Sequence, residues 1–267
     1  MSINIAVAGK GGTGKTSITG MIIRYLLKNG SSPILAVDAD PNANLGESLA
    51  LDVKQTIGSI IASFNEVKIH IPPGMTKEAY LEIRLNDAMV ESKGLDLLTM
   101  GRGEGADCYC YPNTLLRKFM DSLTGNYAYT VMDNEAGMEH LSRRTTQNID
   151  ELLLISDHSM KGVRTLARLK ELVMELKLGV KRQSVIINFV KNELDPSIRD
   201  ELVKLNIEPS AIIPVDEEVR DYDIKVKSLL ELPDTSGAVK AVGDLLKRLL
   251  EKSKFTQKEV QNDGTHY

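Results

Sequence analysis

The sequence has little of what marks nucleic-acid-binding proteins. Its 267 residues contain no tryptophan, and aromatic residues make up only 4% of the chain. Few aromatic side chains leave little material for stacking on exposed bases. The formal net charge of −4 points the same way, because duplex binding depends largely on lysine and arginine side chains that neutralise phosphates. We therefore expect no nucleic-acid partner.

Long apolar runs are lacking as well. No stretch approaches the ~20 apolar residues that cross a bilayer, and the chain opens on a strand-like apolar run without a basic leader. We expect a cytoplasmic protein with no membrane partner. Only two cysteines are present. Two are too few for a disulfide framework, so their spacing matters more than their number.

Short apolar runs alternate with helix-like segments along the whole chain, with no linker between them. Runs of consecutive apolar residues are typical of strands that helices cover on both faces. The repeated strand–helix order favours a mostly parallel sheet in one α/β domain. The strand-like runs are residues 3–8, 34–37, 95–100, 127–132, 152–155, 185–187 and 211–213.

A glycine-rich motif directly follows the first of these runs and precedes a helix-like segment, residues 17–28. It matches G-x-x-x-x-G-K-[ST] at every fixed position, which predicts a P-loop NTPase. Glycines let backbone N–H groups turn around a polyphosphate at the N-terminus of a helix. Lys15 would neutralise the β- and γ-phosphates, and Thr16 would ligate Mg²⁺. The nucleotide-binding residues predicted here are Gly9, Lys10, Gly11, Gly12, Thr13, Gly14, Lys15, Thr16 and Ser17.

The motif carries a second lysine, Lys10, beside the expected one. With it, residues 9–16 resemble the deviant Walker A motif of the superfamily of division-site, plasmid-partition and nitrogenase-iron-protein ATPases. The resemblance implies a homodimer that hydrolyses ATP, in which Lys10 crosses the interface to the partner's nucleotide. Residues 38–45 and 131–137 match the same superfamily at the expected distances.

The resemblance also implies roles for residues after the predicted strands, where ligands collect in parallel sheets. Asp38 and Asp133 would join Thr16 in holding Mg²⁺ and its waters. Asp40 would lie beside the attacking water and complete a catalytic set with Lys10 and Lys15. Further nucleotide contacts are implied for Gly137 near the γ-phosphate, for Asn188 at the adenine edge, and for Pro214, Val215 and Asp216 in a loop closing over the base.

The two cysteines, Cys108 and Cys110, lie two residues apart in a stretch rich in glycine and polar residues. In an extended segment their side chains would leave the same face from Cα atoms about 7 Å apart. Two metal–sulfur bonds of ~2.3 Å plus side-chain reach close that separation. A tetrahedral site needs four ligands, which a two-fold dimer would supply. Reduced core cysteines and a strained local disulfide are the alternatives.

With these cysteines, residues 112–117 and residues 133–141, the chain resembles the CooC-type accessory ATPases that mature nickel carbon monoxide dehydrogenase. The resemblance covers roughly residues 3–250. It implies that hydrolysis of ATP to ADP and phosphate couples nucleotide-driven dimerisation to nickel delivery into a client enzyme. Thiolate tetrads accept both Ni²⁺ and Zn²⁺, so the sequence leaves the metal open. An iron–sulfur scaffold or carrier ATPase and a positional division- or partition-type ATPase are the alternative functions.

The C-terminal residues need a separate interpretation, because division-site ATPases end in an amphipathic membrane anchor. Here the leucines at 245, 246, 249 and 250 precede a polar tail, so we interpret them as core residues of a domain helix over 238–252. We expect the ATPase domain to cover residues 1–252. The tail, residues 253–267, has too little apolar surface to fold, and we expect it to be disordered.

Overall fold

The structure is a computed structural model that describes residues 2–66, 71–102, 110–136, 148–176 and 179–263. Within these residues eight strands form one sheet in the order β3-β4-β2-β5-β1-β6-β7-β8. Neighbouring strands are parallel except β3, which pairs antiparallel with β4. The strands are β1 (Ile3–Gly9), β2 (Ile34–Ala39), β3 (Val90–Ser92), β4 (Leu95–Thr99), β5 (Tyr129–Ala136), β6 (Asn148–Asp157), β7 (Gly179–Val190) and β8 (Ala211–Pro214).

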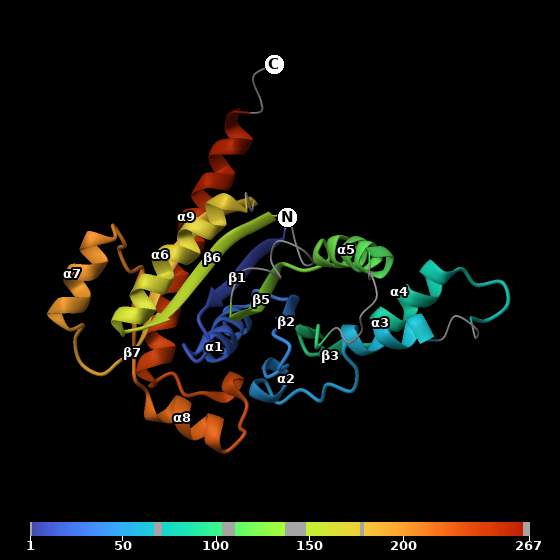
Figure 1. The fold of residues 1–267 in the computed structure, drawn as a ribbon, viewed down its shortest axis with the longest axis horizontal. Coiled ribbons are helices and arrows are strands. Elements are labelled where there is room, and N and C mark those ends of the chain that lie inside the picture. The colour runs from blue at the N-terminus through green and yellow to red at the C-terminus, as the bar shows by residue number, and fades with distance from the viewer. Residues whose placement is uncertain (1, 67–70, 103–109, 137–147, 177–178, 264–267) are drawn as a thin grey trace.

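Helices cover both faces of the sheet (Figure 1), as the sequence predicts. Successive side chains of a strand point to opposite faces, and β1 shows the result. Ile5 and Val7 belong to a core shared with α1, α2 and α9, whereas Ala6 and Ala8 belong to a core shared with α3 to α7. The helices are α1 (Lys15–Lys28), α2 (Leu45–Ser48), α3 (Ile57–Glu66), α4 (Lys77–Asp87), α5 (Cys110–Thr124), α6 (Met160–Glu175), α7 (Pro196–Lys204), α8 (Glu217–Ile224), the short 3₁₀ helix η2 (Leu229–Glu231) and α9 (Gly237–Asp263).

Three adjacent strands bring the predicted site residues to one edge of the sheet. β5 lies between β2 and β1, and Asp133 of β5 is in register with Asp38 of β2 and with Val7 of β1. Since all three strands are parallel, their carboxyl ends meet. The phosphate loop after β1 and the two aspartates therefore share one edge, where ligands bind in sheets of this kind.

Two strands extend well beyond their apolar runs. β6 and β7 include polar residues that the apolar pattern alone does not assign to strands. Glu151 of β6 is only 3% exposed, and its carboxylate accepts hydrogen bonds from Arg182 (2.9 Å) and Ser184 (2.5 Å) of β7. These polar contacts join β6 and β7 in a part of the sheet where the apolar pattern does not predict strands. The short strand β3 was missed because its exposed edge residues form no apolar run.

The C-terminal helix differs from the sequence-based expectation. α9 has 27 residues and ends at Asp263, so it continues 11 residues beyond the expected helix end at residue 252. Residues 253–263 contain no glycine or proline, and adding residues to an established helix is far easier than starting one. Figure 1 shows these last turns, in red, extending beyond the other helices. Among the described residues, no helix combines the length and apolar character that a membrane crossing requires.

Candidate nucleotide site

The phosphate-loop motif lies between a strand and a helix, as predicted. β1 ends at Gly9 and α1 begins at Lys15. A Cβ on Gly9 would lie 2.2 Å from the carbonyl oxygen of Ile155 on β6, so no side chain fits there. Gly14 has a φ of 84°, in the left-handed region that favours glycine. The loop backbone thus depends on its glycines for both space and conformation.

Two side chains of the loop contact the same carbonyl oxygen, that of Lys10. It accepts a hydrogen bond from the Thr13 hydroxyl at 2.8 Å and another from the Lys15 ammonium at 3.4 Å. Lys15 is 7% exposed. The second contact holds a buried positive charge across the loop, where it can attract an anionic ligand. Phosphate binding by Lys15 stays a prediction, with which this buried position in the loop is consistent.

Two buried carboxylates lie next to the loop. Asp133 is 1% exposed and accepts a hydrogen bond from the Thr16 hydroxyl at 2.6 Å. Burial raises the pKa of Asp133 to about 7; the Thr16 hydrogen bond and the charge of Lys15 oppose this rise, and the charge of Asp38 adds to it. Burial likewise raises the pKa of Asp38 to about 6, although its oxygens accept backbone N–H groups from Leu45 (2.9 Å) and Asp40 (3.2 Å).

These residues fit a magnesium ion bound with a nucleotide. One carboxylate oxygen of Asp133, Oδ1, is buried and has no hydrogen-bond partner among the described residues. An unpaired buried anion is unfavourable, and a nearby divalent cation would offset it. Mg²⁺ prefers oxygen ligands and is held by one or two protein groups plus waters and phosphates. Thr16, Asp38 and Asp133 match that donor set; bound there, Mg²⁺ would neutralise charge on the phosphates.

Asp40 lies in a turn just past the end of β2. Its carboxylate accepts hydrogen bonds from the backbone N–H and the side-chain amide of Asn42, at 2.8 and 2.9 Å, and its carbonyl accepts the N–H of Ala43. Asp40 is thus a turn residue and also a carboxylate beside Asp38, at the carboxyl edge of the sheet. The catalytic role inferred from resemblance stays a prediction.

The residues that we expect around the base contact other parts of the protein in this structure. Asn188 at the end of β7 is 4% exposed, and its amide donates to the Thr13 carbonyl oxygen at 2.9 Å. The Asp216 carboxylate caps α8 by accepting the N–H of Glu218 at 2.9 Å, and it also accepts the N–H of Ala238 at 3.0 Å. Burial opposes ionisation, but these hydrogen bonds hold the pKa of Asp216 below its usual value. Pro214 ends β8, and Val215 directly follows it.

Part of the predicted site lies outside the described residues, namely Gly137 and Cys108. Cys110 is the first residue of α5, so the extended conformation assumed for the cysteine pair ends there. Pro112, which lacks an N–H, is favourable in the first turn of this helix. The segment that leads to the cysteines leaves β4, the neighbour of β2. The backbone N–H of Met100 donates to the carbonyl oxygen of Asp38 at 2.8 Å.

Sequence reasoning gave no separate role to Asn134 or Asp157. Asn134 is 1% exposed, and its amide donates to the Val7 carbonyl oxygen at 2.9 Å, where the ladder between β1 and β5 shifts register. A polar residue next to Asp133 at the end of an apolar strand was the available signal. Asp157 ends β6; burial opposes its ionisation, but hydrogen bonds from Ser159 and the charge of Lys10 lower its pKa. Lys10 therefore has an acidic neighbour within its own chain.

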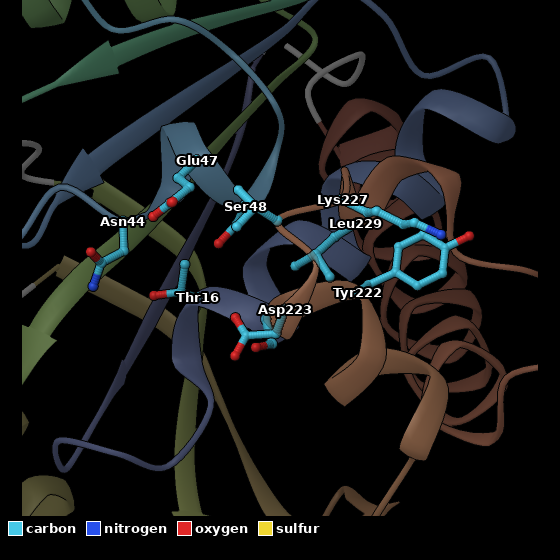
Figure 2. Close-up of a pocket in the computed structure, with 10 residues that line it drawn as sticks. Thr16, Asn44, Glu47, Ser48, Tyr222, Asp223, Lys227 and Leu229 are labelled. Atoms are coloured by element: carbon cyan, nitrogen blue, oxygen red, sulfur yellow. The ribbon is translucent and has the colours of Figure 1, made fainter.

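A pocket of about 210 Å³ opens beside the first turn of α1 (Figure 2). Thr16 belongs to its lining, α2 supplies Glu47 and Ser48, and the segment from α8 to η2 supplies Asp223 and Lys227. The lining therefore carries two carboxylates and one ammonium group, whereas the phosphate loop carries two lysines and no carboxylate.

Comparison with known proteins agrees with this geometry. The nucleotide-binding domain family described as CobQ/CobB/MinD/ParA matches residues 5–229, which include the phosphate loop and both buried aspartates. The chain belongs to the CobQ/CobB/MinD/ParA family. It is a nucleotide-binding ATPase, and the predicted phosphate-loop and aspartate residues lie where β1, β2 and β5 end.

Individual relatives are similar to most of this chain. An uncharacterized ATP-binding protein of Methanocaldococcus jannaschii is 41% identical over 250 residues, 93% of this chain and 98% of that protein. The carbon monoxide dehydrogenase accessory protein CooC of Rhodospirillum rubrum is 29% identical over 204 residues, 72% of this chain and 76% of CooC. The septum site-determining protein MinD of Pyrococcus horikoshii, solved with Mg-ADP, has the same fold, with a TM-score of 0.68 and 20% identity over 93% of this chain and 96% of that chain.

Proposed function

We propose that this ATPase is a metallocentre maturation factor, which couples nucleotide-driven dimerisation to nickel delivery into carbon monoxide dehydrogenase or a related nickel enzyme. The similarity to CooC over 72% of the chain supports the proposal. The paired cysteines supply thiolates, which bind Ni²⁺ and Zn²⁺ well. The fold alone is shared with MinD and therefore does not distinguish metal delivery from positional functions.

The observation that carries the proposal is a direct backbone link between the nucleotide edge and the segment that leads to the cysteines. Asp38, a predicted magnesium residue, accepts the N–H of Met100 at 2.8 Å through its carbonyl oxygen, and Met100 in turn accepts the N–H of Gly58 at 2.8 Å. β4 and β2 are adjacent and parallel. A shift of residues 38–40 with the state of the nucleotide would therefore act on the start of the cysteine segment.

The residues at the edge divide the work of hydrolysis among them. Lys15 and the N–H groups at the start of α1 attract the phosphates, and electrostatic positioning of this kind supplies most of the catalysis of phosphoryl transfer. Thr16, Asp38 and Asp133 would hold Mg²⁺. Asp40, two residues beyond Asp38, would orient a water molecule. These roles require Asp38 and Asp133 to be ionised, although burial favours their protonated forms.

Dimerisation would complete both the nucleotide site and the metal site. Lys10 lies near Asp157 of its own chain, and we propose that ATP binding brings Lys10 to the nucleotide of a second copy. Each chain contributes Cys108 and Cys110, so two chains supply the four thiolates of a closed metal site. Hydrolysis would separate the thiolate pairs and loosen the metal for transfer.

The test measures metal content and mass of the protein without nucleotide, with ADP and with a nonhydrolysable ATP analogue, under anaerobic conditions. We expect one Ni²⁺ or Zn²⁺ per two chains, lost in Cys108→Ser/Cys110→Ser. The single variant Cys108→Ala, with Cys110 intact, keeps half of the thiolates and should bind metal more weakly than wild type but more strongly than the double variant. Unchanged metal content and dimerisation in the double serine variant would refute the proposal.

Two alternative functions would be recognised in the same preparation. Iron and sulfide bound to the paired cysteines would indicate an iron–sulfur scaffold or carrier ATPase. ATP-dependent sedimentation with liposomes or with duplex DNA at low salt would indicate a positional ATPase.

A further inference from the structure

Phe189, at the end of β7, holds a backbone conformation that phenylalanine seldom adopts. Its φ is 63°, in the left-handed region where a bulky side chain is a genuine outlier. Conformations of this kind persist only where the surrounding structure enforces them, and they cluster at ligand-binding and catalytic sites. The position therefore calls for a functional explanation.

The strand around Phe189 is irregular in a way that turns its ring outward. Ile187 of β7 faces Ile212 of β8, but Val190 faces Pro214, so β7 has one more residue than β8 between these pairs. An extra residue of this kind is a β-bulge, which re-aims side chains and is common next to active sites. Asn188 and Val190 are buried, whereas Phe189 is 39% exposed.

The exposed ring lies against the phosphate loop. A Cβ built on Gly14 would lie 2.9 Å from Cζ of Phe189 and 2.5 Å from the amide nitrogen of Asn188. That amide donates to the carbonyl oxygen of Thr13. Ring and amide together therefore border the point at which the loop enters α1. When the phosphates of a nucleotide lie in the loop, its base must project beyond one side of the loop. The side next to Gly14 offers an aromatic ring, that of Phe189.

A second exposed apolar side chain belongs to the same irregularity. Val215 is 39% exposed, and its backbone N–H donates to the carbonyl oxygen of Val190 at 3.0 Å. The bulge thus anchors two apolar groups, Phe189 and Val215, at the ends of neighbouring strands. Apolar groups with a few polar ones beside them are the usual lining of a small-molecule site.

We propose that Phe189 is the stacking surface for the purine base of the bound nucleotide. This proposal deepens the ATPase activity and is independent of metal delivery. Aromatic side chains stack on bases without reading hydrogen bonds, because every base has a π-face. Removing such a contact weakens binding by about 5- to 100-fold. The bulge and the strained φ of Phe189 serve to present its ring to that base.

Three variants separate the ring from the backbone conformation. Phe189→Gly removes the ring and suits the positive φ, so the variant should fold. Phe189→Leu keeps an apolar side chain without a π-face, and Phe189→Tyr restores the aromatic surface. The matched control is Asn206→Gly, a replacement at another residue with positive φ, 52°, beyond the end of α7.

The affinities of ADP, CDP and inorganic tripolyphosphate are measured by calorimetry for each variant. We expect Phe189→Gly and Phe189→Leu to weaken ADP binding by about 5- to 100-fold and CDP binding by less, because a pyrimidine has a smaller ring surface to stack. Tripolyphosphate, which has no base, should bind within twofold of wild type, and Phe189→Tyr should bind ADP like wild type. Unchanged ADP affinity in both variants would overturn the proposal. Equal losses for ADP and tripolyphosphate would also overturn it, because the residue would then act on the phosphate loop.

Discussion

The burial of the Asp133 carboxyl group leads to a quantitative prediction about the free energy of unfolding. Burial raises its pKa from an ordinary 3.8 to about 7. The folded protein therefore binds this proton more tightly than the unfolded chain does. The resulting stability is fully present below about pH 4 and is lost as the pH rises through about 7. Asp133→Asn removes the titration but keeps an oxygen that can accept the hydrogen bond of Thr16.

The size of the effect follows from the pH range. Between pH 5 and pH 7 the unfolded aspartate is ionised and the folded one is largely protonated, so each pH unit changes the free energy of unfolding by ~1.36 kcal/mol. Wild type should therefore lose about 2.5 kcal/mol relative to Asp133→Asn between pH 5 and pH 8. Any packing penalty of the new amide is the same at both values and cancels in this comparison.

Urea unfolding of the nucleotide-free and Mg²⁺-free protein at pH 5 and pH 8 measures this difference. Asp38→Asn is the matched control. An asparagine there has one acceptor oxygen for the two backbone N–H groups that Asp38 binds, at 2.9 and 3.2 Å, and an unpaired buried N–H costs about 1–3 kcal/mol. At pH 8, Asp38→Asn should therefore gain less stability than Asp133→Asn. A stability difference between wild type and Asp133→Asn that is equal at pH 5 and pH 8 would refute this account of the site.

Two further substitutions test residues whose roles the structure defines. Asn134→Ala should destabilise the protein by about 1–3 kcal/mol in urea unfolding, because the Val7 carbonyl oxygen loses its buried partner; a change below ~0.5 kcal/mol would show that the bridge is dispensable. Asp216→Ala should lower stability by about 1–2 kcal/mol through the lost cap of α8. If the Asp216 side chain instead binds nucleotide, the substitution will weaken the free energy of ADP binding by more than it lowers the free energy of unfolding.

Local sequence patterns were sufficient to locate seven of the eight described strands and the phosphate loop. The glycine-rich motif has fixed spacing, and it sits between an apolar run and a helical run, so strand, loop and helix are all specified within residues 3–28. The apolar runs predicted the strands for the same reason. Polar pairs such as Glu151 with Arg182 extend strands through contacts between distant residues, and a pattern within one segment cannot show them.

The residues for which we predict or propose a contact with the base were harder to describe from the sequence, for a related reason. Asp216 follows a strand, as many nucleotide-binding residues do, but its carboxylate caps one helix and ties down the start of another. Phe189 acquires its exposure from a register shift between β7 and β8. The contacts of Asp216 and the exposure of Phe189 depend on how neighbouring strands and helices pack together. The order of residues in one sequence does not reveal that packing.

We propose that hydrolysis at the phosphate loop controls the release of a metal ion bound by Cys108 and Cys110, and metal release during turnover is the measurement that bears on this coupling. Protein loaded with Ni²⁺ or Zn²⁺ is mixed with a chromophoric chelator, and release is followed after addition of Mg-ATP or of a nonhydrolysable analogue. We expect rapid release with Mg-ATP, retention with the analogue, and retention in Asp40→Ala with either nucleotide. Equal release with ATP, with the analogue and without nucleotide would contradict this proposal.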